Sequence, residues 1–337
     1  MGLKRHNLAI DPGTANTVII KGNAMVLDEP SAVAVLPEDY PPAKLLVAGS
    51  HAYAMFSNWK IKAIRPLQLD NAYVYPGSVE FMLKQFIKSV GGNPLFLRQI
   101  RTEKPKMVVA VPYVVPDYLN EALHAIQERM CYEIFLIQKP LAAGMAIGKD
   151  FLEKGGMLVD LGASSTEISI IGNYGIVEYY SLPFAGDMFN RDIMKHIGRA
   201  FKVRVGLPTA ERAKVSLGIM QDSNTEEFLL RGPDYLTGNP VEVKLYSSDI
   251  ASWLNLRLSD IEVQIARMIE STHPDLRSAI AENGIWLMGG TSQMKGLERR
   301  FNEKLDIQCK LVPSPRHIAA WGAYKALYDE SQCLLTL

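Results

Sequence analysis

The stretch Leu8–Ile20, LAIDPGTANTVII, has a counterpart in Leu158–Ile170, LVDLGASSTEISI. In both, an apolar strand ends in aspartate, and a glycine follows two residues later, a threonine six later and an isoleucine eight later. Chance is the alternative, because short strand-turn-strand hairpins are common. Four matched positions at identical offsets favour an internal duplication, and they predict two similar α/β domains that meet near residue 150.

Strand and helix signals alternate after both stretches. Short apolar runs at Met107–Val111 and Ile134–Ile137 predict strands that are buried on both faces. Pro140 marks a helix N-terminus. Further helices are predicted at Asp117–Arg129, Gly186–Phe201, Thr209–Ile219 and Ser248–Ser271, a further strand at Gly284–Met288, and an inserted tract of strand and loop at Pro30–Pro66. This alternation predicts mixed or parallel sheets covered by helices.

Composition narrows the function classes. The 337 residues include 36 Lys+Arg and 36 Asp+Glu, and 48% of them are apolar. Zero net charge argues against a dedicated nucleic-acid binder and does not oppose self-association. Three cysteines without a CxxC pair, Cys131, Cys309 and Cys333, indicate a reducing compartment, so we expect the cytosol. We find no membrane-spanning run, signal peptide, zinc-enzyme His motif, hydrolase elbow or Walker motif.

Two strand-end turns carry the first chemical signal. In Asp11–Thr14 and Asp160–Ser165, glycine lets successive backbone N–H groups point into the turn, where they can hold phosphate oxygens. An aspartate at the strand end can hold the water shell of a Mg²⁺ that bridges phosphates. One such turn in each domain predicts a polyphosphate site.

Two other motifs are ambiguous when taken alone. Gly289 and Gly290 follow an apolar strand and precede a predicted helix at Met294–Lys304, which is the pattern of an ordinary strand-helix turn. Glu211 and Lys214 are three residues apart in a predicted helix, which is typical of a solvated helix face.

Taken together, the motifs resemble the ordered series of the MreB family of bacterial actins, within the actin, sugar-kinase and heat-shock chaperone superfamily. The resemblance runs from about residue 7 to about residue 328. The segments that carry it are DPGTANTVII (11–20), DEPSAVAV (28–35), AIRPL (63–67), VVAVPYVVP (108–116), IFLIQKPLAAGMAIG (134–148), LVDLGASSTEISII (158–171), AGDMFNRDI (185–193), TAERAKVSLG (209–218) and LMGGTSQMKGL (287–297).

The resemblance implies an actin-like α/β fold of two duplicated domains around a nucleotide cleft. Each domain would hold a mixed sheet with flanking helices and a small subdomain. We expect domain I at 1–148 with 315–337, its small subdomain inserted at about 30–75, and domain II at 149–314, its small subdomain at about 190–260.

It also implies ATP or ADP with Mg²⁺ as cofactors. The matched first phosphate loop is Asp11, Gly13, Thr14, Ala15 and Asn16, and the second is Asp160, Gly162, Ala163, Ser164 and Ser165. Asp11 and Asp160 would lie near the Mg²⁺ and hold it through water molecules. Glu211 and Lys214 match ribose and adenine contacts, and Gly289 and Gly290 match the adenosine loop.

Two departures from the family pattern concern hydrolysis. Gln138-Lys139-Pro140 stands where the family typically has Glu-Glu-Pro, so the carboxylate that orients the attacking water is absent. A lysine ammonium only donates hydrogen bonds and would sooner pair with the γ-phosphate. We therefore expect slow or lost hydrolysis unless Gln138 takes over. The second loop has lost two glycines, and we expect binding to survive this change better than turnover survives Lys139.

The function implied is an ATP-binding bacterial actin, at most a weak ATPase, that polymerises into cytoskeletal filaments in cell-shape or spatial organisation. Copies stacked head to tail form a filament because the contact does not close. A small-molecule kinase or a nucleotide-gated assembly or chaperone module of the same superfamily are the alternatives. Expected partners are copies of itself, other bacterial actins and cell-wall or morphogenesis proteins.

Membrane contact is a separate prediction. The apolar triplet Leu95, Phe96 and Leu97 precedes the cations Arg98, Arg101, Lys104 and Lys106, a combination suited to an anionic membrane surface. Its position resembles the membrane-insertion loop of the family and implies a peripheral location at the inner membrane. A triplet packed against its own domain is the alternative. The apolar tail Cys333–Leu337 would be a second anchor, a partner contact or a frayed end.

Overall fold

The computed structural model describes residues 7–36, 44–57, 61–91, 105–130, 132–219, 227–328 and 335–336. The chain divides into two compact units, residues 1–152 with 317–337 (unit 1) and residues 153–316 (unit 2). The predicted membrane triplet at 95–97 and the cations Arg98, Arg101 and Lys104 lie outside the described residues.

Unit 1 is built on a six-stranded sheet in the order β16-β8-β7-β1-β2-β3. Its strands are β1 (Leu8–Pro12), β2 (Asn16–Lys21), β3 (Ala24–Pro30), β7 (Lys106–Val111), β8 (Glu133–Gln138) and β16 (Leu335–Thr336). A second sheet holds β4 (Val33–Leu36), β5 (Lys44–Ala48) and β6 (Lys62–Ile64), and the helices are α1 (Ser50–Tyr53), η2 (Ala54–Ser57), α2 (Leu69–Val74), α3 (Ser78–Ser89), α5 (Asp117–Met130), α6 (Lys139–Ile147) and α13 (Ile318–Ala326).

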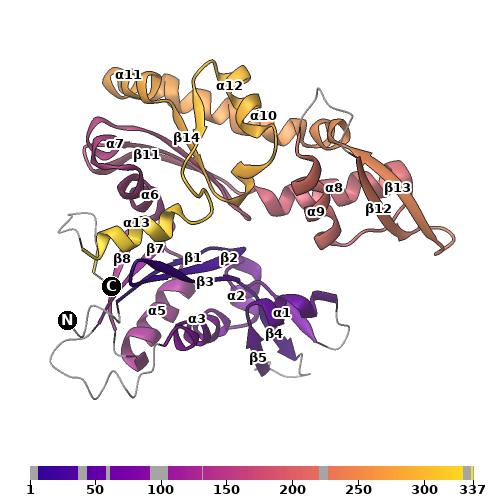
Figure 1. The fold of residues 1–337 in the computed structure, drawn as a ribbon, viewed down its shortest axis with the longest axis horizontal. Coiled ribbons are helices and arrows are strands. Elements are labelled where there is room, and N and C mark those ends of the chain that lie inside the picture. The colour runs from indigo at the N-terminus through magenta and orange to yellow at the C-terminus, as the bar shows by residue number, and fades with distance from the viewer. Residues whose placement is uncertain are drawn as a thin grey trace. The chain divides into compact units, whose positions relative to one another are not determined.

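Helices cover both faces of the unit 1 sheet. Alternate residues of β1 and β7, such as Leu8, Ile10 and Val109, join the cluster formed with α3 and α5, whereas α13 packs against β1 and β7 from the other face (Figure 1). A strand buried on both faces reads as a continuous apolar run, which is why these strands were visible in the sequence. The approach of α13 to α6 is tight: a Cβ at Gly322 would lie 1.6 Å from the Ala142 carbonyl oxygen.

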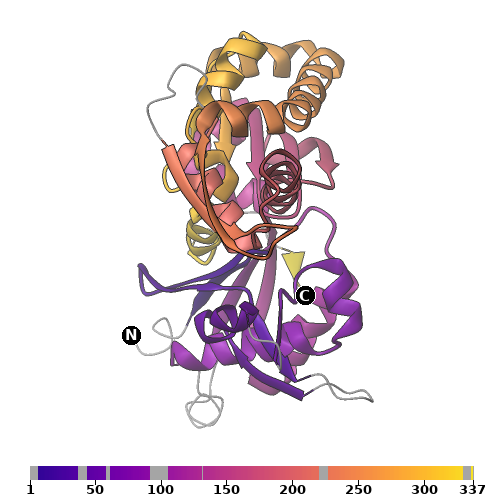
Figure 2. The ribbon, with the colours of Figure 1, turned by 90° about the vertical axis from the view of Figure 1, so that its right-hand side faces the viewer.

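Unit 2 is built on a five-stranded sheet in the order β11-β10-β9-β14-β15. Its strands are β9 (Gly156–Leu161), β10 (Thr166–Gly172), β11 (Gly175–Leu182), β14 (Ile285–Met288) and β15 (Cys309–Leu311), and β12 (Glu227–Pro233) with β13 (Pro240–Tyr246) forms a separate two-stranded ribbon, orange in Figure 2. The helices are α8 (Gly186–Phe201), α9 (Leu207–Leu217), α10 (Ser247–Ser271), α11 (Pro274–Asn283), the 3₁₀ helix η3 (Gly290–Gln293) and α12 (Leu297–Leu305), while α7 (Lys149–Lys154) spans the boundary between the units.

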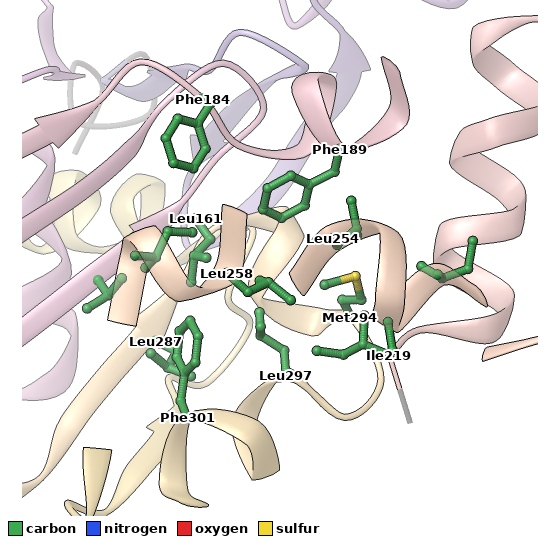
Figure 3. Packing of buried hydrophobic residues seen from close by; sticks show 14 of the residues in the cluster. Leu161, Phe184, Phe189, Ile219, Leu254, Leu258, Leu287, Met294, Leu297 and Phe301 are labelled. Atoms are coloured by element: carbon green, nitrogen blue, oxygen red, sulfur yellow. The ribbon is translucent and has the colours of Figure 1, made fainter. Parts of the chain in front are cut away.

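The core of unit 2 joins its sheet to α8, α10 and α12. Leu161 and Leu287 project from neighbouring strands towards Leu258 of α10 and Phe301 of α12 (Figure 3). Phe189 at the start of α8 is fully buried in the same cluster. This core therefore holds the ends of β9 and β14 and the start of α8 in place. These three segments surround the turn between β9 and β10.

The two main sheets repeat one topology, as the sequence duplication predicts. β3-β2-β1-β7-β8 corresponds to β11-β10-β9-β14-β15: the first two pairings are antiparallel and the next two are parallel in both sheets. The hairpin register is also the same, since Asp11 pairs with Val18 and Asp160 with Glu167, seven residues on in each case. The matched residues therefore occupy equivalent places in two equivalent sheets.

Some local expectations were wrong. The glycine turn after β14 leads into η3, and α12 begins only at Leu297, because Gly296 at φ 83° interrupts the helix expected from Met294. The tract at 30–66 contains the short helices α1 and η2 beside its strands. In the apolar tail, Leu335 and Thr336 form β16 and pair with β8 at the edge of the sheet.

Candidate phosphate-binding turns

The first turn joins β1 to β2 at the carboxyl end of β1. Its residues 13–16 are half-buried, whereas Asp11 is buried with 7% of its surface exposed. A Cβ at Gly13 would lie 2.6 Å from the Asn16 carbonyl oxygen, so only glycine fits this turn without a backbone shift. The backbone is thus folded back on itself at the place where the sequence predicts a phosphate loop.

The DEPS segment at 28–31 supports this turn through hydrogen bonds. The Ser31 hydroxyl donates to the Gly13 carbonyl oxygen at 2.6 Å and lies 2.8 Å from the Thr17 hydroxyl. Asn16 Nδ2 donates to Asp28 Oδ1 at 3.0 Å, and His317 Nε2 lies 3.0 Å from Asp28 Oδ2. In the sequence this segment stands out only as one motif of the family series. Its hydrogen bonds to the first turn could not be predicted there.

Lys139 makes the most consequential contact of the first turn. Its Nζ lies 2.9 Å from Asp11 Oδ1, and the side chains are only 15% and 11% exposed. In this structure Lys139 forms an ion pair with the aspartate expected near Mg²⁺, and the γ-phosphate contact expected from the sequence stays a prediction. A buried carboxylate needs such compensation, because an unpaired buried charge is costly.

Gln138 is anchored beside this pair. It ends β8, and its Nε2 donates to the Tyr113 carbonyl oxygen at 3.2 Å in the loop after β7. This hydrogen bond uses the amide nitrogen of the carboxamide. The amide oxygen of Gln138 is the atom that can accept a hydrogen bond from water. The hydrogen bond to Tyr113 is therefore compatible with Gln138 orienting the attacking water.

The second turn joins β9 to β10 and has a different set of supports. Residues 162–165 are half-buried, like those of the first turn, and the Gly162 N–H donates to the Ser165 carbonyl oxygen at 3.1 Å. Thr166, the counterpart of Thr17, donates from Oγ1 to the Phe184 carbonyl oxygen at 2.9 Å. The turn is therefore tied to the segment that leads into α8.

The glycine turn after β14 packs directly against Asp160. A Cβ at Gly289 would lie 2.3 Å from Asp160 Oδ1 and 2.4 Å from the Leu161 carbonyl oxygen, and Gly289 has φ 85°. Two residues on, Thr291 Oγ1 donates to the Gly162 carbonyl oxygen at 2.7 Å. The third glycine motif is thus part of the second turn's environment and is more than a strand-helix connection.

Lys214 reaches the same place from α9. It is buried, and its Nζ donates to the Gly186 carbonyl oxygen at 3.2 Å at the start of α8. The Gly186 N–H in turn donates to the Gly162 carbonyl oxygen at 3.3 Å. Glu211 lies one turn earlier on α9 and is half-buried. The reading of Glu211 and Lys214 as a solvated helix face is therefore wrong for Lys214.

Two carboxylates beside the second turn, those of Glu167 and Asp160, act on Tyr179. Ser165 Oγ lies 3.4 Å from Glu167 Oε1. Burial, followed by the charge of Glu167 and, more weakly, that of Asp160, raises the pKa of Tyr179 on β11 to about 12. Asp160 thus has Glu167 and Tyr179 in its neighbourhood, whereas the neighbour of Asp11 is the ammonium group of Lys139.

The fit of Mg²⁺ differs between the two aspartates. Among the residues that the structure describes, no three His, Cys, Asp or Glu side chains come together as a metal cage. That is compatible with Mg²⁺, which uses one or two carboxylates with water and phosphates. Asp11, however, is already neutralised by Lys139, so its surroundings fit an added dication poorly.

The structure thus brings the predicted residues together unit by unit. In unit 1 it joins the first loop to Lys139, and in unit 2 it joins the second loop to Lys214, Gly289 and Thr291. The supporting residues Ser31 and Thr291 were missed, because each acts through a contact that only the strand order creates.

The family model of the MreB/Mbl protein matches residues 5–334. The chain belongs to the MreB/Mbl protein family. It is 33% identical to the cell shape-determining protein MreB of Escherichia coli over 333 residues, which cover 97% of this chain and 94% of that protein. It is 31% identical to the cell shape-determining protein Mbl of Bacillus cereus over 322 residues, which cover 94% of each. The family resemblance seen in the sequence is confirmed.

Solved structures of this family and its neighbours share the fold, which is actin-like as predicted. MreB5 of Spiroplasma citri bound to AMPPNP superposes with a TM-score of 0.84 at 25% identity, covering 96% of both chains. The MamK double helical filament superposes with a TM-score of 0.76 at 20% identity, covering 96% of this chain and 99% of that one. Within the described residues, no helix is both long and apolar enough to cross a membrane.

Proposed function

We propose that this protein is an ATP-binding bacterial actin whose subunits assemble into filaments that serve cell shape or spatial organisation. The observation that carries the proposal is the pair of strand-end turns in one register, in a chain of the MreB/Mbl family. MreB5 is described bound to AMPPNP and MamK as a double helical filament, and both support the proposal by likeness.

Each turn is a candidate for holding phosphate oxygens of the nucleotide. Each offers half-buried backbone at the end of a buried strand, the arrangement in which N–H groups hold phosphate oxygens. In unit 2, Gly289 packs its backbone against the second turn and Gly290 beside it is exposed. Lys214 reaches the same place from α9, and Glu211 lies one turn earlier on that helix, so these four residues are our candidates for contacts with the nucleoside. Asp160 is the better of the two aspartates for a water-bridged Mg²⁺.

Sedimentation tests the filament. We expect the protein to pellet at high speed with ATP and to stay in the supernatant without nucleotide. Gly13→Ala should abolish ATP-dependent pelleting because its Cβ collides with Asn16, whereas Gly175→Ala, whose nearest neighbour atom is 3.9 Å away, should pellet normally. A chain that stays in the supernatant with ATP at every concentration tried contradicts the proposal.

Hydrolysis is proposed to be slow. Lys139 cannot accept a proton from water, and Gln138 is the remaining acceptor. Phosphate release should rise at least several-fold in Lys139→Glu, because a carboxylate at this position would orient water. Equal rates in the two proteins would mean that residue 139 is not the catalytic position.

Membrane contact is proposed from sequence alone, through Leu95, Phe96 and Leu97 at the inner membrane surface. Serine at all three positions should abolish co-sedimentation with anionic liposomes, while the ATP-dependent pellet without lipid is retained. Binding unaffected by the serines would move the contact elsewhere, and the apolar tail is then the first segment to test. Contacts with other bacterial actins or with morphogenesis proteins belong to the same proposal.

A further inference from the structure

The ion pair between Lys139 and Asp11 places a fixed cation beside the first turn. The Nζ–Oδ1 distance is 2.9 Å, and both side chains are largely shielded from water. Shielding matters because the attraction between two charges about 4 Å apart is several times stronger near a protein than in bulk water. The ammonium therefore neutralises the Asp11 carboxylate more fully than a surface lysine does.

Strand order creates this pair. β1, β7 and β8 are parallel neighbours, so the ends of β1 and β8 lie at the same edge of the sheet, on either side of β7. Since adjacent strands are about 4.8 Å apart, β1 and β8 are separated by roughly 10 Å. Lys139 directly follows β8, and its long side chain spans the gap to Asp11.

The position of Lys139 is unfavourable for a cation by local rules. It is the first residue of α6, where the helix dipole is positive and a carboxylate would be preferred. Asp11 supplies the compensation across the sheet. Lys139 at the start of α6 pairs with the buried carboxylate of Asp11. Its positive charge therefore lies beside the first turn, where the proposed function places phosphate.

We propose that the Lys139 ammonium takes the place of a divalent cation at Asp11, so that this protein binds a nucleoside triphosphate with little dependence on Mg²⁺. The inference rests on the proposed function, because it needs a nucleotide at the first turn. A divalent ion at Asp11 would have to displace the ammonium or share the carboxylate with it, and both weaken its binding.

Calorimetric titration with AMPPNP, in MgCl₂ or in EDTA, tests the inference by the ratio of the two Kd values. We expect the native protein to bind within about threefold of the same affinity in both buffers. Lys139→Met, which keeps an unbranched side chain without charge, should raise the ratio about tenfold, or about 1.4 kcal/mol. Lys139→Glu should raise the ratio further. If Lys139→Glu does not fold, Lys139→Met alone still tests the inference.

Lys84→Met is the matched control. Lys84 also pairs with a carboxylate of unit 1, Glu80 at 3.2 Å, but on α3 and away from the first turn. It should leave the ratio unchanged. As a readout without nucleotide, MgCl₂ should raise the Tm of Lys139→Met more than that of the native protein, because Asp11 then lacks its internal cation.

The outcomes separate the two proposals. Binding in MgCl₂ but not in EDTA by the native protein overturns the inference and leaves the proposed function standing. A ratio that Lys139→Met does not change also overturns the inference. If AMPPNP binds in neither buffer, the proposed function fails and the inference falls with it.

Discussion

The turns after β1 and β9 have the same register and the same pattern of exposure, yet their aspartates have different neighbours. Asp11 pairs with the ammonium of Lys139, whereas Asp160 packs against Gly289 on the side of the sheet that also carries Glu167. Duplication has thus preserved the backbone while the surroundings diverged. The comparison teaches that equivalent carboxylates can have different roles. Asp11, which already pairs with Lys139, needs an external cation less than an unpaired carboxylate would.

The largest expected effect tests the packing of the second turn. Gly289→Ala should lower the free energy of unfolding by about 3 kcal/mol, because its Cβ has no room beside Asp160 and its φ is 85°. Gly290→Ala is the control, since its nearest neighbour atom is 3.6 Å away. Urea denaturation measures both, and similar losses would show that Asp160 does not depend on this close approach.

The next effect tests the charge pair of the first turn. Lys139→Met should cost about 2 kcal/mol of unfolding free energy, because it leaves Asp11 buried without its cation. Asp11→Asn added to Lys139→Met should restore part of this loss. A double-mutant cycle measured by denaturation gives the coupling energy, and a value near zero would remove the basis of the comparison.

A smaller effect separates the two matched threonines. Thr166→Val should cost about 1.5 kcal/mol, because the buried Phe184 carbonyl oxygen loses its donor. Thr17→Val should cost less than about 1 kcal/mol, because Ser31 still donates to Gly13. Thermal unfolding of the two variants compares them directly. A larger loss at Thr17 would mean that the hydroxyl pair, and not Ser31 alone, holds the first turn.

The smallest effect concerns the negative charge near Asp160. Tyr179 has a pKa of about 12, so it stays protonated in the folded protein while an unfolded chain ionises from about pH 10. The unfolded state then binds fewer protons, and stability falls as the pH rises from 10 to 12. Glu167→Gln should lower the pKa of Tyr179 by less than about one unit, measured as the absorbance difference from Tyr179→Phe. Glu178→Gln removes a neighbouring charge and should leave this pKa unchanged.

The fold could be predicted from sequence because its signal is local and repeated. Asp11 and Asp160, with Thr17 and Thr166, mark two hairpins whose offsets the structure reproduces. The Lys139–Asp11 pair could not be predicted in this way. It joins residues that are 128 positions apart, and they meet because the strands lie in the order β1-β7-β8. That order cannot be inferred from the spacing of residues along the chain.

The same limit applies to the supports of the turns. Ser31 and Thr291 are ordinary hydroxyl residues in the sequence, and their value comes from the carbonyl oxygens of Gly13 and Gly162 that the sheets place beside them. Glycines were more informative: Gly13 and Gly289 stood out as turn residues, and the structure explains both by close backbone approach.

The discontinuity of unit 1 bears on how the chain is made. Residues 153–316 form a continuous stretch, so unit 2 has its whole sequence available while synthesis is still in progress. Unit 1 needs residues 317–337, including α13, whose Gly322 lies against Ala142. Domains fold as units during translation, generally from the N-terminal end. We expect unit 2 to reach its folded state before unit 1, because α13, which packs against β1, β7 and α6, is made only after residue 317.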